Sequence, residues 1–412
     1  MNRFVSALAL ASLMACSGSD DTTVDDTDMD TDTAVPVQVR FATFNVSLFG
    51  TSAGQVASTL NRENFAPAIA LAATLQEVRP DIVLLNELDY DADGTSVQRL
   101  MDNFLSVSQD GREPLDYPHV YIPTVNTGVP SGADLNNSGD VATSVGTNAY
   151  AGDSQGFGTY PGQYGMVLLS VYPIDTANIR TFQEVLWSEM PDALLPKNED
   201  GSDWYSEEAL DVARVSSKTH ADVPVLIEDT VVHVLISHPT PPSFDGDEDR
   251  NGRRNHDEIR LWTDYLSADE DGWMVDDNGV SGGLGDGSFV IMGDLNNDPN
   301  DGDSLGEAIT DLIGHARVAG DSVPASEGAA EQAELQGGVN ADHTGPASAD
   351  TADFRDSDVG NLRLDYVLPS NDMDILDSQV FWPLSSDPLF ELVGIFPFVV
   401  SDHRLVWVDV EI

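Results

Sequence analysis

The sequence predicts an α/β fold in which the ends of buried strands carry the functional residues. Short apolar runs of strand length recur from residue 39 onwards, and each has a polar residue at or near one end. Residues 65–77 and 258–266 instead place apolar side chains at helical spacing, which predicts two helices. Residues 36–412 are enough for one large core, and no internal repeat is visible.

The most informative run covers residues 289–292 and is followed by Gly293, Asp294 and Asn296. Gly293 allows the backbone to turn at the end of the strand, and Asp294 and Asn296 then project beyond that turn. An acid and an amide two residues apart can hold a water molecule, a metal ion or a phosphate oxygen. Ordinary loops also begin with this pattern, so the segment does not identify a site by itself.

Other strands repeat this arrangement. Apolar runs at 39–45, 81–87, 231–238, 362–369 and 405–410 carry a polar residue at or near one end, and these residues are Asn45, Glu87, His238, Asp365, Asp402 and His403. A packed sheet holds side chains at strand ends rigidly. The repetition therefore favours one assembled site over unrelated turn-capping residues.

In this order the motifs resemble those of the endonuclease/exonuclease/phosphatase (DNase I-like) superfamily, which includes nucleases, inositol phosphate phosphatases and neutral sphingomyelinases. The matching segments are residues 43–45, 86–87, 237–238, 293–296, 364–367 and 401–403. The resemblance implies a four-layer α/β/β/α sandwich of two mostly antiparallel sheets. Gly-, Asp- and Ser-rich stretches at about 126–160, 266–287 and 319–358 are expected to be insertions.

The resemblance also implies metal-dependent hydrolysis of a phosphoester. Asn45, Glu87 and Asp402 are the expected metal ligands. Hard divalent ions prefer oxygen donors, so Mg²⁺ is expected, with Mn²⁺ or Ca²⁺ as alternatives. Ser47 stands where some members of the superfamily carry an acid, which leaves open whether a second metal is bound.

The remaining matches receive catalytic roles from the same resemblance. His238 and Asn296 are expected to hold phosphate oxygens. Asp365 would orient His403 and raise its pKa, so that the imidazolium can stabilise negative charge. Either Asp294 or His403 takes the proton of the attacking water, and the resemblance does not distinguish between them.

Residues 247–258 fit the spacing of a calcium-binding loop, D-x-[DN]-x-[DN]-G-x5-E. The candidate ligands of a structural Ca²⁺ are Asp247, Asp249, Asn251 and Glu258. In a chain with 71 acidic residues such a match also arises by chance. We expect a calcium loop here, as one of two functional interpretations.

The second interpretation of the same segment is a phosphate clamp made by Arg253, Arg254 and His256, because positive groups are scarce in this chain. A surface cluster of salt bridges is the third alternative. Tyr164 precedes another apolar run and is a further candidate for contact with the phosphate.

The start of the chain resembles a bacterial lipoprotein signal peptide. Residues 1–15 contain Arg3, an apolar run at 4–11 and a small residue before Cys16. Cys16, the only cysteine, would then be lipidated, and residues 16–35 form an acidic, low-complexity tether to a catalytic domain at 36–412. We expect a monomer in the cell envelope, lipid-anchored at the outer membrane or cell surface, or secreted if unanchored. The membrane would be contacted through the lipid anchor only.

The charge balance narrows the range of substrates. The net charge is −53 at pH 7, and only two lysines, Lys197 and Lys218, are present. Tight, processive DNA binding needs a basic stripe, which is absent here. The remaining candidate substrates are a phosphodiester, in nucleic acid or in a small phosphorylated molecule, and a phosphomonoester of a sugar or inositol. A non-catalytic, calcium-stabilised surface-binding domain is the alternative outside the enzyme class.

Overall fold

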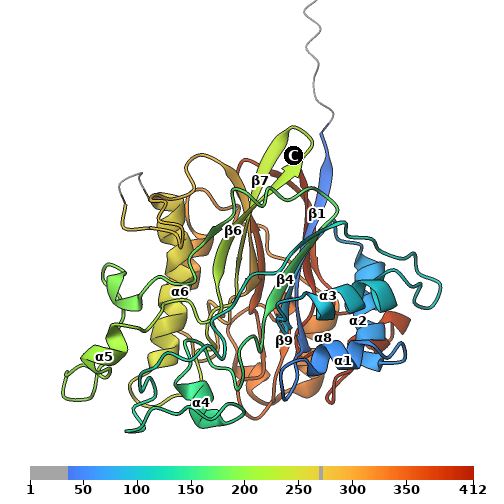
Figure 1. Cartoon of the computed structure of the whole chain (residues 1–412). Helices are drawn as coiled ribbons and strands as arrows, with labels where there is room; N and C mark the ends of the chain where they lie inside the picture. Colours follow the sequence, from blue (N-terminus) through green and yellow to red (C-terminus); the bar gives the residue numbers. More distant parts are fainter. Residues whose placement is uncertain (1–35, 269–271) are drawn as a thin grey trace, which may run out of the picture. The chain divides into compact units, whose positions relative to one another are not determined.

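Two β-sheets form the centre of the computed structural model, which describes residues 36–268 and 272–412 (Figure 1). The predicted signal peptide, Cys16 and the tether lie outside the described residues. One sheet has the strand order β12-β13-β1-β2-β4-β3 and the other β11-β8-β7-β6-β5. Neighbouring strands are antiparallel, except that β1 is parallel to β2 and β7 is parallel to β8.

The bounds of the strands follow chain order. They are β1 (Gln38–Leu48), β2 (Ile82–Leu88), β3 (His119–Tyr121), β4 (Met166–Ser170), β5 (Arg180–Thr181), β6 (His220–Ile227), β7 (Thr230–Ser237), β8 (Ser288–Asp294), β11 (Asp365–Pro369), β12 (Asp374–Val380) and β13 (Val406–Glu411). A separate two-stranded sheet pairs β9 (Ala352–Asp353) with β10 (Asn361–Leu362).

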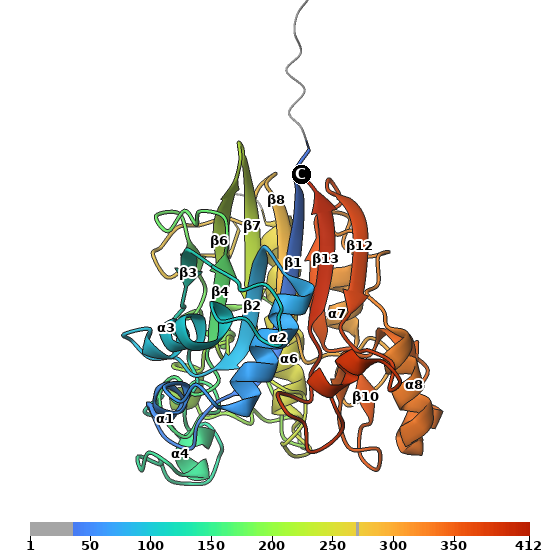
Figure 2. The same cartoon turned by 90° about the vertical axis from the view of Figure 1, so that its right-hand side faces the viewer.

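Helices cover the outer face of each large sheet. On the six-stranded sheet these are α1 (Gln55–Leu60), α2 (Ala66–Val78) and α3 (Thr95–Leu100), and on the five-stranded sheet α6 (Arg250–Ser267) and α7 (Glu307–Ile313) (Figures 1 and 2). The remaining helical segments are the π-helix η1 (Met101–Leu105), α4 (Asn148–Gly152), α5 (Glu207–Leu210), α8 (Glu327–Gln336) and the 3₁₀ turns η2 (Trp187–Glu189), η3 (Gly338–Asp342), η4 (Ala347–Ala349) and η5 (Pro388–Leu392). The expected four-layer α/β/β/α sandwich is confirmed.

Alternation along the strands produces these layers, because successive side chains of a strand point to opposite faces. Phe41 of β1 packs between the two sheets, whereas its neighbour Ala42 packs against the helices. In β2, Leu84 and Leu85 divide in the same way. Phe41 is completely buried, so its replacement by alanine would cost about 3–5 kcal/mol.

The helix predictions differ in their success. The helix predicted at 65–77 is confirmed as α2. The helix predicted at 258–266 begins much earlier, at Arg250, and therefore occupies most of the expected calcium loop. The stretch 319–358, expected to be an insertion, contains α8. None of the helices among residues 36–268 and 272–412 combines the length and the hydropathy needed to cross a bilayer.

Candidate active site

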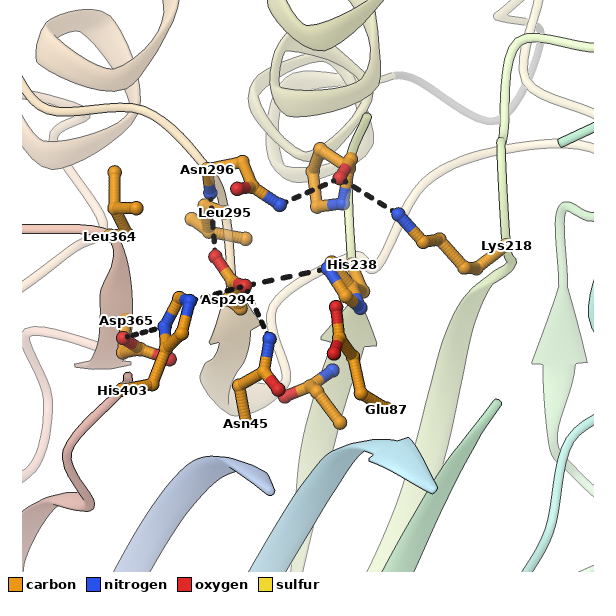
Figure 3. Close-up of polar contacts among 12 residues, drawn as sticks. Asn45, Glu87, Lys218, His238, Asp294, Leu295, Asn296, Leu364, Asp365 and His403 are labelled. Carbon is orange, nitrogen blue, oxygen red and sulfur yellow. Dashed lines mark hydrogen bonds and ion pairs between the residues drawn. The ribbon is translucent and has the colours of Figure 1, made fainter. Parts of the chain in front are cut away.

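Strand ends from both sheets meet at one edge of the sandwich (Figure 3). Parallel strands end at the same edge of a sheet, so β1 and β2 bring together the positions of Asn45 and Asn86, next to Glu87. In the other sheet β11 runs antiparallel to β8, and its first residue, Asp365, lies opposite Asp294. The topology thus gathers residues that are hundreds of positions apart.

Asp294 lies at the centre of this group and is buried. Its Oδ2 accepts a hydrogen bond of 3.0 Å from Asn45 Nδ2. The same oxygen is 3.4 Å from His238 Nε2 and 3.7 Å from His403 Nε2. Its Oδ1 accepts from the backbone N–H of Asn296 at 3.0 Å. Burial raises the pKa of Asp294 to about 6, although His403 opposes the shift.

Gly293 makes this placement possible, by a different route from the turn that we predicted. It lies inside β8, and a Cβ atom at this position would be 2.0 Å from the carbonyl oxygen of Ser237. Any other residue would push β8 away from the end of β7 and separate Asp294 from His238. Glycine is required here for a close approach between two backbones.

His403 and Asp365 form the second part of the site. His403 Nδ1 and Asp365 Oδ2 share a hydrogen bond of 2.8 Å, and Thr351 Oγ1 donates to the same oxygen at 2.8 Å. Burial lowers the pKa of His403, but the carboxylates of Asp365 and Asp294 outweigh it and hold the pKa well above its usual value. His403 therefore carries a positive charge at neutral pH, as expected. Thr351 was not predicted.

His238 lies on the other side of Asp294 and has the opposite protonation state. Burial, together with the positive charges of Lys218 and His403, lowers its pKa well below the usual value. The imidazole is therefore neutral at pH 7. Its Nδ1 atom is buried and has no hydrogen-bond partner among the described residues. Two histidines flanking one carboxylate thus differ in charge because their neighbours differ.

Glu87 projects from the end of β2 toward this group (Figure 3). Its nearest hydrogen-bonding partner is Ser47 Oγ, at the long distance of 3.5 Å. Burial raises the pKa of Glu87 to about 7, and nearby Asp294 adds to the shift. Glu87, Ser47, Tyr164 and Asn296 all have positive φ angles, between 49° and 60°. Such strained backbone positions cluster at functional sites.

Lys218 is a site residue that the sequence analysis missed. Its side chain is buried, lines the same cavity as Glu87 and Asp294, and donates from Nζ to the carbonyl of Pro239 at 3.2 Å. Asn296 Nδ2 donates to that carbonyl at 3.1 Å. Burial lowers the pKa of Lys218 against the opposing effect of Glu258 and Glu87. The signal that could have identified it is its rarity, since the chain has only two lysines.

The donor set at this edge fits a hard divalent cation. Glu87 offers a carboxylate with one weak partner, and Asn45 Oδ1 accepts only from the N–H of Ser47 at 3.1 Å among the described residues. Asp402 lines the same cavity, and its Oδ1 accepts from Ser401 Oγ at 3.4 Å. Asp294, Asp365 and His403 also place ligand atoms within 4.8 Å of one another. His403 and Asp365 are, however, already bonded to each other, which favours Glu87 and Asn45 as ligands.

The predicted calcium loop at 247–258 is wrong. Asn251 and Glu258 both lie in α6, where a separation of seven residues corresponds to about 10 Å along the axis. They cannot contact one ion at the 2.3–2.6 Å typical of Ca²⁺. Glu258 is instead fully buried and accepts from Ser217 N, Ser217 Oγ and Thr240 N at 2.6–2.8 Å. Asp247 is exposed, and Asp249 immediately precedes the helix.

Of the alternative clamp of Arg253, Arg254 and His256, only Arg254 lines the cavity that contains Glu87 and Asp294. Arg254 donates to four backbone carbonyls, those of Gln155, Arg214, Val215 and Ser216. Arg253 Nε donates to the carbonyl of Glu248 at 3.1 Å, and His256 Nδ1 is 3.1 Å from Asp257 Oδ1. The three side chains have separate structural partners. Tyr164 also lines this cavity, and its contact with a phosphate stays a prediction.

One cavity of about 1760 Å³ is lined by Asn45, Glu87, Tyr164, Lys218, Asp294, Asn296, Asp402 and His403. The model of the Endonuclease/Exonuclease/phosphatase family matches residues 42–403, a span that includes every strand end described above. The chain belongs to this family, which confirms the resemblance inferred from its motifs. The members of this superfamily are phosphoester hydrolases such as nucleases and sphingomyelinases. The chain matches no curated protein.

Solved structures provide three further comparisons. An endonuclease/exonuclease/phosphatase from Beutenbergia cavernae DSM 12333 is 18% identical, with 91% of this chain and 72% of that chain covered and a TM-score of 0.45. A family protein from Leptotrichia buccalis C-1013-b is 13% identical, with 91% and 100% covered and a TM-score of 0.45. A beta toxin from Staphylococcus aureus with bound magnesium ions is 13% identical, with 90% and 99% covered and a TM-score of 0.40.

Proposed function

We propose that this protein is a metal-dependent phosphodiesterase. The single observation that carries the proposal is the arrangement around Asp294, where Asn45, His238 and His403 all contact one buried carboxylate oxygen. Desolvating four polar side chains in this way costs stability unless their arrangement serves a function. Glu87, with its raised pKa of about 7 and a weak partner, provides the place for a cation beside them.

Glu87 and Asn45 would hold the cation, and Mg²⁺ is the expected ion because the donors are oxygens. When bound, the cation supplies electrostatic stabilisation to a phosphoryl oxygen. It would also offset the repulsion that Asp294 exerts on Glu87, which adds to the effect of burial in raising the pKa of Glu87 to about 7.

Asp294 is the group that we assign as general base. His403 is protonated at neutral pH, so it has no free lone pair for the proton of a water molecule. Asp294 has a pKa of about 6 and is ionised at pH 7, close enough to neutrality for efficient proton transfer. His403 then acts as a positively charged donor to the phosphoryl group or the leaving oxygen, oriented by Asp365.

His238, Asn296 and Lys218 complete the set of donors. His238 is neutral and can donate from one ring nitrogen to a phosphate oxygen. Asn296 and Lys218 share the carbonyl of Pro239, which fixes both side chains at the wall of the cavity. Each donor contributes most where charge develops in the transition state.

The test is a substrate panel assayed with Mg²⁺, Mn²⁺ or Ca²⁺. It should contain bis-p-nitrophenyl phosphate, p-nitrophenyl phosphate, plasmid DNA, inositol phosphates and phospholipid. We expect hydrolysis of the diester that disappears with EDTA and returns with added metal. Full diesterase activity after verified metal removal would overturn the metal dependence. Preference for p-nitrophenyl phosphate would instead support a phosphomonoesterase.

We also propose that the protein acts outside the cytoplasm as a lipid-anchored enzyme, based on residues 1–16 of the sequence. Lipidation of Cys16 would attach it stably to a membrane. The wild type should then fractionate with membranes, and Cys16→Ser should release it or leave an unprocessed precursor. A wild-type protein that is entirely soluble outside the cell would refute the anchor.

A further inference from the structure

Large apolar side chains are exposed around the mouth of the catalytic cavity. The exposed fractions are 90% for Phe244, 82% for Phe396, 67% for Leu335, 61% for Ile395 and 56% for Phe157. All five side chains line the cavity that contains Glu87, Asp294 and His403. We refer to these five residues as the apolar rim. Scattered exposed apolar residues are common, whereas a set gathered at one opening marks an interaction site.

The rim is assembled from four separate segments of the chain. Phe157 follows α4, Phe244 lies between β7 and α6, Leu335 is in α8, and Ile395 and Phe396 lie between η5 and β13. The apolar surface also extends inward, because the ring of Phe354 meets the ring of His403 edge-on at 5.7 Å between centroids. The rim and the catalytic groups therefore belong to one continuous surface.

Phe244 shows that this exposure is not incidental. Its φ angle is 70°, in the left-handed region that bulky residues avoid, and its side chain has almost no packing partners. The fold therefore bears the cost of a strained backbone and an exposed phenyl ring at the same position. Strain of this kind is typical of residues that contact a ligand.

The charges near the rim limit what can bind there. Nine acidic residues line the same cavity, among them Asp301, Asp303, Asp356 and Asp358, against four lysine or arginine residues, Lys218, Arg250, Arg254 and the exposed Arg355. The whole chain has a net charge of −53. A polyanion such as nucleic acid, or an anionic membrane, would be repelled from this opening. A surface that is apolar inside and electrically neutral outside would not be repelled.

We propose that the apolar rim docks onto a net-neutral, zwitterionic lipid surface, and that the substrate is a phosphodiester lipid of that surface. This inference rests on the proposed phosphodiesterase function and specifies its substrate. The rim side chains enter the lipid layer, and the head group with its phosphate enters the cavity. The apolar half of the lipid packs against Phe354. Because the ring of Phe354 contacts the ring of His403, this half lies on the same side of the phosphate as the imidazolium.

The reaction that follows from this orientation is balanced without a further reactant. A water oxygen forms a bond to phosphorus and gives one proton to Asp294. The bond between phosphorus and the oxygen of the apolar alcohol breaks, and that oxygen takes a proton from His403. The products are an apolar alcohol, which stays in the lipid layer, and a water-soluble phosphomonoester of the head group.

The experiment compares the wild-type chain with the double variant Phe244→Ser/Phe396→Ser. Each is measured for co-sedimentation with vesicles of phosphatidylcholine and sphingomyelin, for release of soluble phosphate ester from them, and for hydrolysis of bis-p-nitrophenyl phosphate. The matched control is Val231→Ser, which is 45% exposed and lies at the opposite end of β7 from His238. Two further substrates are tested in the same way. One is vesicles that contain phosphatidylglycerol, and the other is single-stranded DNA.

We expect the wild type and the control to bind and cleave the neutral vesicles. The double variant should lose at least tenfold in both, with hydrolysis of the soluble diester within twofold of wild type. Wild type that cleaves the soluble diester but neither binds nor cleaves vesicles would overturn the lipid inference alone. The lipid inference would also be overturned if the double variant lost more activity on single-stranded DNA than on vesicles. The same holds if the wild type were a dimer and the double variant a monomer. Failure on every diester with every metal would overturn the proposed function itself.

Discussion

Lys218 and Asn296 donate hydrogen bonds to the same acceptor, the backbone carbonyl of Pro239, at 3.2 Å and 3.1 Å. This shared acceptor links the start of β6 to the loops that follow β7 and β8 at the wall of the cavity. Lys218 is therefore held as part of the site, although its sequence context shows no motif.

The first prediction concerns this lysine. Lys218→Met should lower kcat by roughly 10²-fold, because a buried cation aimed at developing negative charge is removed. Lys218→Arg should restore part of the activity, since it keeps the charge. Steady-state kinetics with a soluble diester will measure both, and thermal unfolding will check that the domain stays folded. Equal activity of the methionine variant and wild type would exclude Lys218 from the machinery.

Glu87 provides the second prediction. Glu87→Gln keeps the size of the side chain but removes the carboxylate, so it should weaken Mg²⁺ or Mn²⁺ binding and reduce kcat by roughly 10²-fold or more. Isothermal titration calorimetry will measure the affinity without relying on turnover. The variant should fold normally, because Ser47, at 3.5 Å, is the only hydrogen-bond partner of the Glu87 side chain among the described residues. Unchanged metal affinity would move the cation site elsewhere.

The third prediction concerns the hydrogen bond between His403 and Asp365. His403→Ala and Asp365→Asn should each reduce kcat strongly, and the double variant should be little worse than the poorer single variant. Groups that act as one unit are non-additive in this way. Multiplicative losses in the kinetic double-mutant cycle would show that the two residues act independently.

Glu258 distinguishes the observed structure from a calcium loop. Glu258→Gln replaces one acceptor oxygen by a donor in front of the N–H groups of Ser217 and Thr240, so it should destabilise the domain by about 3 kcal/mol. The loss should be the same with calcium or with a chelator, as measured by urea unfolding. A loss seen only when calcium is present would restore the loop interpretation.

The fifth prediction is a pH dependence of stability. Burial lowers the pKa of His220 from 6.5 to about 4, so the folded state holds this side chain neutral. The neutral imidazole contributes fully to the free energy of unfolding above pH 6.5. This contribution is lost as the pH falls toward 4, because the unfolded chain then binds the proton more tightly than the folded chain. The lost contribution is about 2 kcal/mol at pH 5.

The variant His220→Gln should lack this pH-dependent part of the unfolding free energy. The difference in unfolding free energy between wild type and variant should therefore shrink by about 2 kcal/mol between pH 7.5 and pH 5, as measured by urea titration. A difference that does not change with pH would show that the imidazole titrates normally. His220 bonds to Ser216 Oγ and the carbonyl of Glu258 and to none of the proposed metal ligands, so metal content should not affect the result.

The strands and their polar ends could be predicted because each is encoded locally. A run such as 289–292 is apolar on both faces, since it is buried between the other sheet and the helices, and Asp294 follows directly. The beginning of α6 could not be predicted in the same way. Its first turns bury Asn255, Asp257 and Glu258 against loops near the site, so the apolar periodicity starts only at Ile259.

Residues fixed by distant contacts were also missed. Thr351 belongs to the site because its hydroxyl reaches Asp365, and Lys218 because its ammonium reaches Pro239. Neither contact leaves a local signal in the sequence. The calcium pattern failed for the converse reason, because oxygens at alternate positions suit an ion only in a loop, and α6 separates them.

The proposed catalytic residues and metal ligands are divided between the two large sheets. Asn45 and Glu87 come from the six-stranded sheet, and His238 and Asp294 come from the five-stranded sheet. The contact between Asn45 and Asp294 is thus a bond across the seam of the sandwich. Catalytic competence therefore depends on the docking of two halves that can each keep their own ladder of hydrogen bonds. Separation of the two sheets would therefore inactivate the protein before its secondary structure is lost. The rate of turnover measures whether the two sheets are docked, and not whether either sheet is folded.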